Sequence, residues 1–267
     1  MKFKSLLVTC WLAFILSACS TSSTGRNQVL LYSSNELESM GLQSFDVIKQ
    51  KEKMSINKAT NKFVQCVSSA ITVNIPKSSH DGSWEIVVFD SEQVNAFALP
   101  GGKIGIYTGI LKVTENQDQL AAIIAHEVGH VIENHSNERI SSQRLSQTSM
   151  AIAGAALESH GIKNRNLYMS GLGIGLQYGV LMPYSRAHES EADVIGQELM
   201  AKSGFNPEAS IELWQNMAAL SNKKTLPEFM STHPSNKKRI NELTTHLAVS
   251  SKLYKSENNP KCYKPKS

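Results

Sequence analysis

The sequence lacks any run of about 18 consecutive apolar residues, the minimum for a helix that spans a bilayer. It has no internal repeat of the kind that builds solenoids or propellers. It also lacks a basic patch with interleaved aromatic residues, and its formal net charge of +4 is too small to indicate a nucleic-acid partner. The remaining composition is ordinary for a globular protein, and 267 residues can form one domain or two small ones.

The N-terminus has the pattern of a secretion signal. Lys2 and Lys4 precede an apolar segment from Leu6 to Leu16, and small residues then lead to Cys19. The stretch that ends at this cysteine resembles the bacterial lipobox, in which the chain is cut before the cysteine and its thiol is lipidated. The alternatives are a plain signal peptide or a short membrane anchor, although the apolar segment is too short to span a bilayer comfortably.

We therefore predict a signal peptide over residues 1–18, and a lipidated Cys19 followed by a polar tether up to residue 34. Lipidation would place the chain on a membrane through this cysteine. Ser20, where some known lipoproteins have aspartate, suggests sorting to the bacterial outer membrane, with the protein facing the periplasm.

Cysteine is scarce, with four residues in the whole chain. Cys10 would leave with the signal and Cys19 would be acylated, so Cys66 and Cys262 remain in an oxidising compartment. The oxidising compartment and the even number of remaining cysteines both favour a disulfide between these two residues over two buried free thiols. Such a bridge would tie the C-terminal tail, residues 248–267, to an N-terminal helix.

The strongest chemical signal is the motif His126-Glu127-Val128-Gly129-His130, which lies in an apolar run. Residues four apart lie on one face of an α-helix, so both imidazoles can reach the same metal ion, with Glu127 on the adjoining flank. This is the HExxH pattern of zinc proteases, with two zinc ligands and a general base. A buried helix with incidental histidines is a poor alternative, because each buried imidazole would need its own partner.

A catalytic zinc needs a third protein ligand and one open position. His135 is the nearby histidine, but it lies about half a turn round the helix axis from the first two, so it would point away. Glu189 on a later helix would complete a His₂Glu site. Asp193, four residues on, shares its face and can hold a liganding imidazole in place, whereas Glu191 should face elsewhere.

Residues 35–73 show helical spacing, and residues 84–89 and 103–107 are predicted strands joined through a turn at Pro100-Gly101-Gly102. The segment 145–182 is rich in Ala, Gly, Met and Leu. It is interpreted as closely packed helices, with a mobile lid or a membrane-touching loop as the functional alternative.

The chain resembles the HtpX/CAAX-prenyl-protease family of zinc metallopeptidases, and in particular its bacterial lipoprotein members. The resemblance covers roughly residues 25–245 and is carried by motifs in the family's order. These are Asn95–Gly102, Ile106–Leu111, the HExxH helix, Glu189-x-Glu-Ala-Asp193, and Thr232-His233-Pro234 with Arg239.

The resemblance implies one Zn²⁺ held by His126, His130 and Glu189, with Glu127 as the general base. His233 would then stabilise the oxyanion or cap the metal, and Arg239 would line the site as a further catalytic residue that stabilises charge on the tetrahedral intermediate. The implied fold is α+β and mostly helical, a gluzincin-type zincin core over residues 35–247 with a small β-sheet beside the HExxH helix.

We expect a zinc metalloendopeptidase that cleaves unfolded or misassembled envelope proteins. An edge strand that includes Asn95 and Ala96 would bind the substrate backbone. The rival interpretations are a zinc-binding assembly or chaperone lipoprotein with little proteolytic activity and a peptidoglycan hydrolase. The base Glu127 argues against the first, and the absence of HxxxD and HxH spacing argues against the second. The sequence identifies no partner protease or assembly machinery.

Overall fold

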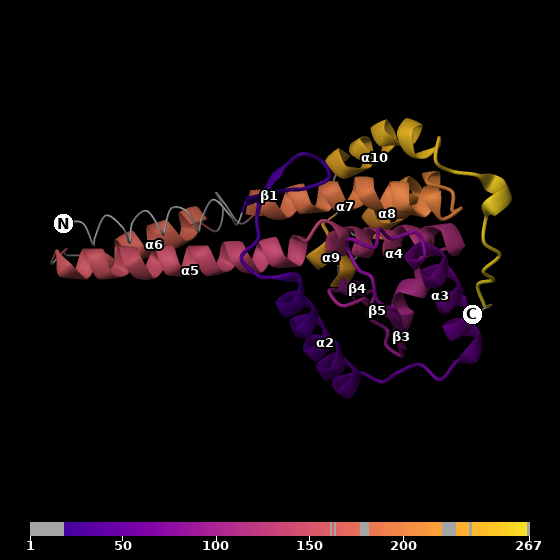
Figure 1. Cartoon of the computed structure of the whole chain (residues 1–267), viewed down its shortest axis with the longest axis horizontal. Helices are drawn as coiled ribbons and strands as arrows, with labels where there is room; N and C mark the ends of the chain where they lie inside the picture. Colours follow the sequence, from indigo (N-terminus) through magenta and orange to yellow (C-terminus); the bar gives the residue numbers. More distant parts are fainter. Residues whose placement is uncertain are drawn as a thin grey trace. The chain divides into compact units, whose positions relative to one another are not determined.

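The computed structural model describes residues 19–160, 162, 164–176, 182–220, 228–234 and 237–265, so the predicted signal peptide lies outside it. The described chain is mostly helical with small sheets, as expected (Figure 1). It divides into two compact units, and we call them unit 1 (Met1–Ser34 and Glu133–Ala187) and unit 2 (Asn35–Ile132 and His188–Ser267). The predicted domain over residues 35–247 contributes to both units.

Unit 2 contains a three-stranded sheet whose order is β3-β5-β4. Strand β3 (Glu85–Phe89) pairs parallel with β5 (Lys103–Tyr107), and β4 (Ala96–Leu99) pairs antiparallel with β5. The turn between β4 and β5 contains Gly101 and Gly102 with φ of 83° and 69°, a conformation that favours glycine. In the described part of the chain, β4 pairs with β5 alone, so it is an edge strand of this sheet.

Helices make up most of the rest of unit 2. They are α2 (Ser34–Lys51), α3 (Lys58–Thr72), α4 (Gln117–Ile132), the part of α7 (Met182–Lys202) from His188 onward, α8 (Glu208–Leu220), α9 (Glu228–Thr232) and α10 (Lys237–Ser250). Two short 3₁₀ helices, η1 (Thr108–Lys112) and η3 (Ser256–Asn258), complete it.

Helix α4 carries the HExxH motif and forms the centre of the core. It is buried along most of its length, and its apolar residues Leu120, Ile123, Ile124 and Val128 are completely buried. A helix of this kind must be covered all round, and α4 packs on α3, α8 and β4. Each such side chain contributes roughly 1.5–3 kcal/mol by leaving water, so the motif sits on a rigid support.

The disulfide predicted between Cys66 and Cys262 is present, and it joins α3 to the C-terminal tail. The tail also reaches the start of α4. Gln117 donates to Asn259 Oδ1 at 2.7 Å and accepts from the Cys262 backbone N–H at 2.8 Å. The tail is thus bonded to the helix that carries the HExxH motif.

Unit 1 contains the antiparallel strands β1 (Cys19–Thr21) and β2 (Asn27–Val29), with helices α5 (His135–Ser159) and α6 (Arg165–Leu176). The residues expected to form a flexible tether instead begin with this hydrogen-bonded hairpin, which turns at Gly25 with φ of 87°. In segment 145–182, α5 and α6 pack against each other, as expected for closely packed helices (Figure 1). Within the described ranges, no helix is long and apolar enough to cross a membrane.

Candidate metal centre

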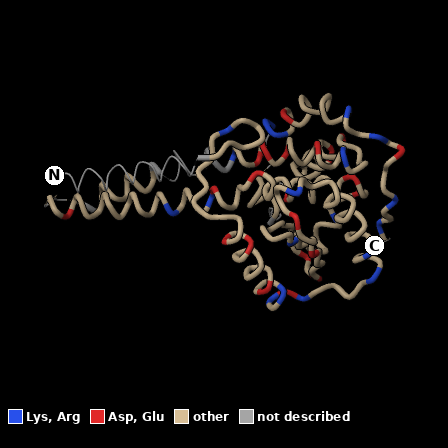
Figure 2. Tube along the Cα trace, in the orientation of Figure 1, with Lys and Arg blue, Asp and Glu red and all other residues tan. Residues whose placement is uncertain are grey.

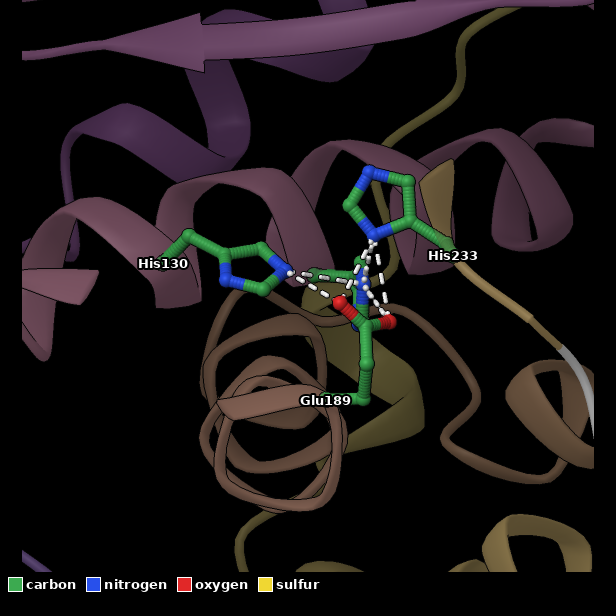
Figure 3. Close-up of side chains that lie close together, drawn as sticks. His130, Glu189 and His233 are labelled. Carbon is green, nitrogen blue, oxygen red and sulfur yellow. Dashed lines mark hydrogen bonds and ion pairs between the residues drawn. The ribbon is translucent and has the colours of Figure 1, made fainter. Parts of the chain in front are cut away.

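Four side chains of unit 2 converge on one point. His126 and His130 come from α4, Glu189 from α7, and His233 directly follows α9. One nitrogen or oxygen atom from each lies within 4.8 Å of the corresponding atom of every other. Figure 3 shows His130, Glu189 and His233 pointing toward one another. The helical spacing of the HExxH motif therefore does bring its two imidazoles together.

The separations between these atoms match those of metal ligands. His126 Nε2 lies 3.2 Å from His130 Nε2, 3.3 Å from His233 Nδ1 and 3.4 Å from Glu189 Oε2. Glu189 Oε1 lies 3.5 Å from His130 Nε2 and 3.1 Å from His233 Nδ1. Ligand atoms at about 2.0–2.1 Å from a tetrahedral zinc are about 3.3 Å apart. The four residues therefore fit a tetrahedral metal ion.

Hydrogen bonding alone does not explain this cluster. His126 Nε2 faces two imidazole nitrogens and a carboxylate, and a ring nitrogen carries at most one hydrogen. The charges point the same way. Glu127, Glu189 and Asp193 are all buried, and Arg239 is the buried cation that faces them. If the three carboxylates are ionised and the histidines are neutral, as imidazoles are when they bind a metal, this group has a net charge of −2, which a divalent cation would balance.

Close helix packing brings the Glu189 helix to the motif helix. A Cβ atom on Gly196 of α7 would lie 2.8 Å from the His126 backbone nitrogen, and one on Gly129 of α4 would lie 3.0 Å from the Ala192 carbonyl oxygen. Only glycine fits at such distances from a neighbouring backbone. These two glycines allow α4 and α7 to approach until Glu189 reaches the two histidines.

A second layer of contacts holds the donor residues in place. Asp193 Oδ1 lies 3.1 Å from His126 Nδ1, on the side of the ring that faces away from the cluster. Arg239 donates to both oxygens of Asp193, at 2.6 and 2.7 Å, and its Nη1 lies 2.9 Å from Glu189 Oε2. The guanidinium therefore holds both carboxylates, and it also donates to the Pro234 carbonyl oxygen at 3.1 Å.

Burial and charge shift the titration of these groups. Burial alone would lower the pKa of His126, but its contacts with Asp193 and Glu189 prevail and raise the pKa to about 9. Burial opposes ionisation of Glu189, yet His126 and His233 hold the pKa of Glu189 well below its usual range. Asp193 behaves alike, because the neighbouring Arg239 lowers its pKa despite burial.

Glu127 differs from the other carboxylates of the site. Burial raises its pKa above the ordinary value, against the pull of the nearby cations. Its Oε1 atom is fully buried and accepts no hydrogen bond from the described residues, and His233 Nε2 lies 3.4 Å from it. A buried carboxylate with an open acceptor atom beside a metal position is suited to take a proton from water.

An aromatic wall completes the site, and sequence reasoning missed it. The Trp214 ring of α8 lies 3.9 Å below the Arg239 guanidinium and 5.6 Å from the His126 ring. Phe229 of α9 stacks on both Trp214 and His233. Neither aromatic residue belongs to a motif, and a single sequence carries no signal that would have assigned them here.

The other predicted residues lie elsewhere. His135 begins α5 in unit 1 and Glu191 is buried on α7, and neither belongs to the four-residue cluster.

Ala96 starts the edge strand β4, and the Asn95 carbonyl accepts from the Tyr107 N–H at 3.1 Å, which extends the pairing by one residue. Cys19 is the first residue of β1.

The chain was compared with known proteins. A family model described as peptidase family M48 matches residues 58–247. The chain is 40% identical to the mitochondrial metalloendopeptidase OMA1 of Schizosaccharomyces pombe over 169 residues, which are 62% of this chain and 48% of that protein. It is 31% identical to OMA1 of Saccharomyces cerevisiae over 218 residues, 78% of this chain and 60% of that protein.

A bacterial relative is also similar. The β-barrel assembly-enhancing protease of Yersinia pestis is 30% identical over 176 residues, which are 62% of this chain and 36% of that protein. The chain thus spans about half the length, or less, of several curated relatives that it matches.

Proposed function

This chain belongs to peptidase family M48, and we propose that it is a zinc-dependent endopeptidase that cleaves unfolded or misassembled envelope proteins. The observation that carries the proposal is the convergence of His126, His130 and Glu189 near Glu127, whose buried Oε1 atom accepts no hydrogen bond from the described residues. A purely structural zinc site would be closed by its ligands and would need no neighbouring base. This contrast favours a protease over a zinc-binding chaperone.

His126, His130 and Glu189 would hold the zinc. When bound, the ion lowers the pKa of a water ligand from 15.7 toward roughly 7 and polarises the scissile carbonyl. Glu127 accepts the proton of the attacking water at Oε1 and later passes it to the leaving amine. Asp193 and Arg239 act as positioning residues, because their contacts run to His126 and Glu189 rather than toward open space.

His233 has two possible roles, oxyanion stabilisation and capping of the metal. Its Nδ1 lies 3.1 Å from both oxygens of Glu189 and 3.3 Å from His126 Nε2, in the position of a fourth ligand. These distances support the capping role, in which the enzyme is held latent. A movement of His233, which directly follows the short helix α9, would open that position to water.

The substrate backbone would pair with β4. Within the described residues this strand is bonded on one side only, to β5, and it packs on the motif helix α4. An added strand gains affinity from main-chain hydrogen bonds with little choice of side chain. Asn95 and Ala96, at its start, would make the first contacts. Unfolded proteins, whose backbones are free, suit such a site.

The compartment is proposed from the N-terminus and the disulfide. A lipid on Cys19 would anchor the protein to the bacterial outer membrane, facing the periplasm. The Cys66–Cys262 bridge supports an oxidising compartment. The Yersinia pestis relative is named for β-barrel assembly, which supports envelope proteins as the substrates.

The decisive experiment separates the base from the ligands. Glu127→Gln should retain zinc and fold while proteolysis of an unfolded model protein falls at least ~100-fold, the scale of general-base loss. His126→Ala and Glu189→Ala should lose zinc as well, whereas Glu191→Gln, the matched control on α7, should keep it. Near-wild-type proteolysis by Glu127→Gln would show that the mechanism is wrong.

A second experiment distinguishes the roles of His233. If it caps the metal, His233→Ala should raise basal proteolysis because the fourth position is freed for water. If it serves the oxyanion, the same change should lower turnover by roughly 10²–10³ with zinc binding retained. Unchanged turnover would remove His233 from both roles.

A further inference from the structure

We propose that helices α5 and α6 of unit 1 form a membrane-surface element, whose apolar side chains enter the interfacial layer of a phospholipid bilayer. We call the two helices the α5–α6 hairpin. The inference depends on the proposed function only for the identity of the bilayer, which is the one that the lipid on Cys19 would enter.

Large apolar side chains are exposed on both helices of the hairpin. Ile152 on α5 is 63% exposed, and Leu167 and Ile174 on α6 are 72% and 61% exposed. Tyr168 and Leu172 are also about half exposed. Single exposed apolar residues are common on protein surfaces, but several of them on two helices that pack against each other point to an interaction surface.

Charged residues are scarce in most of the hairpin. Residues 145–176 contain three charged residues, Glu158, Lys163 and Arg165, among 32. A water-facing helix pair typically carries a charged or polar outer face. Figure 2 shows correspondingly long stretches of α5 and α6 without charged residues. The hairpin thus has an outer surface that water solvates poorly.

A groove between the two helices adds to this surface. It has a volume of about 410 Å³ and is lined mainly by apolar atoms, with Ala153 and Leu157 from α5 and Tyr168 and Leu172 from α6. An apolar groove that opens at the surface can receive hydrocarbon chains. Tyrosine is an amphipathic residue that is enriched at membrane interfaces, which suits the place of Tyr168.

The position of Cys19 in unit 1 identifies the occupant of this surface as a bilayer. The segment that follows Cys19, from the turn of the β1–β2 hairpin to Tyr32, is bonded to the start of α5 and to the residues just before it within unit 1. Arg26 forms a bidentate pair with the fully buried Glu138, at 2.6 and 2.7 Å, and Gln28 donates to the Glu133 carbonyl at 2.6 Å. Asn137 donates to the Tyr32 carbonyl at 2.7 Å. A lipid on Cys19 would therefore hold α5 close to the membrane.

The hairpin would lie on the membrane rather than cross it. Neither α5 nor α6, as far as the structure describes them, is long and apolar enough to span a bilayer. An interfacial helix combines an apolar face with cations that contact phospholipid head groups. Arg139 and Arg144, both exposed on the first half of α5, supply such cations on the anchor side of the hairpin.

The test uses mature protein without its acyl chain, residues 19–267 with Cys19→Ser, so that binding cannot come from the anchor. Its partition onto vesicles of phosphatidylethanolamine and phosphatidylglycerol is measured by flotation. The hairpin variant carries Ile152→Gln, Leu167→Gln and Ile174→Gln. The control carries Ile56→Gln, Val73→Gln and Tyr263→Gln in unit 2, where these side chains are 90%, 78% and 80% exposed.

We expect the unacylated protein to bind vesicles. The hairpin variant should bind at least ~100-fold more weakly, because each of its three substitutions replaces an apolar side chain and should weaken binding by up to roughly tenfold. The control variant should bind as the parent does. Both variants should keep the parent's thermal midpoint, because all six positions are exposed. Equal binding by the parent and the hairpin variant, or no binding by the parent, would overturn the inference.

A spectroscopic readout reports insertion directly. Tyr168→Trp should add fluorescence that lipids brominated on their acyl chains quench, above the background of Trp84 and Trp214 in unit 2. If vesicles do not bind and the hairpin variant instead lowers the sedimentation mass, the surface joins two copies of the chain and the membrane proposal is wrong. Proteolysis by the same samples tests the proposed function separately.

Discussion

Gly196→Ala probes how closely the two ligand-bearing helices must approach. The added Cβ would lie 2.8, 2.9 and 3.0 Å from three backbone atoms, the nitrogen and Cα of His126 and the carbonyl carbon of Ala125. These atoms belong to the buried helix α4 and cannot move aside as a side chain can. Carbon contacts relax to about 3.5 Å or more, so α7 must shift outward by about 0.7 Å.

The shift affects the metal site more than it affects folding. Overpacking costs about 1–3 kcal/mol, while the better helix propensity of alanine returns about 1 kcal/mol, so the net loss of stability is about 0–2 kcal/mol. Ligand distances, by contrast, tolerate only about 0.2 Å. With Glu189 displaced, zinc affinity should fall by about two orders of magnitude, on the scale of a misplaced catalytic group.

The assay is competition for zinc with a chromophoric chelator, together with thermal unfolding and proteolysis of an unfolded model protein. Gly171→Ala on α6 is the matched control, because a Cβ there meets nothing within 4 Å. Gly129→Ala, with its closest contact at 3.0 Å, should give an intermediate effect. Equal zinc affinity in Gly196→Ala and Gly171→Ala would refute the reasoning.

Three further changes test the surrounding structure. Asp193→Asn should weaken zinc binding by roughly 10–100-fold through the His126 contact, measured by the same competition, and an unchanged affinity would remove Asp193 from this role. Replacing Cys66 and Cys262 by serine opens a link of sequence separation 196, which should cost up to roughly 5 kcal/mol of unfolding free energy in urea titrations. Thiol labelling of denatured, non-reduced parent protein should find neither cysteine free. Cys19→Ser in the full chain should abolish lipidation, and a processed variant that still pellets with outer membranes would place anchoring elsewhere.

Local patterns in the sequence were enough to predict part of the site. The pairing of His126 with His130 follows from helical periodicity alone, because four residues make about one turn. The strands near residues 85–89 and 103–107 were also predicted, since β-branched and aromatic residues concentrate there. The Cys66–Cys262 disulfide was predicted because these are the two cysteines that remain once Cys10 and Cys19 are assigned to the signal peptide and the lipid anchor.

Contacts between distant segments required the tertiary structure. Arg239 was expected to line the site, but its grip on Asp193 and its stacking on Trp214 join three helices. The choice of His233 Nδ1, rather than Nε2, as the nitrogen that faces Glu189 depends on how the end of α9 approaches α7. A single sequence carries no periodicity that records such approaches.

The N-terminal segment shows the same limit. Residues 19–29 are polar and rich in Ser and Thr, and their composition predicted a flexible tether. In the structure Arg26 pairs with the buried Glu138, 112 positions further along the chain, and this partly buried pair orders the segment. Local composition determines which conformations a segment favours when it is isolated. Only the tertiary structure brings a distant partner such as Glu138 to the segment, and that contact offsets the conformational entropy that the segment loses on becoming ordered.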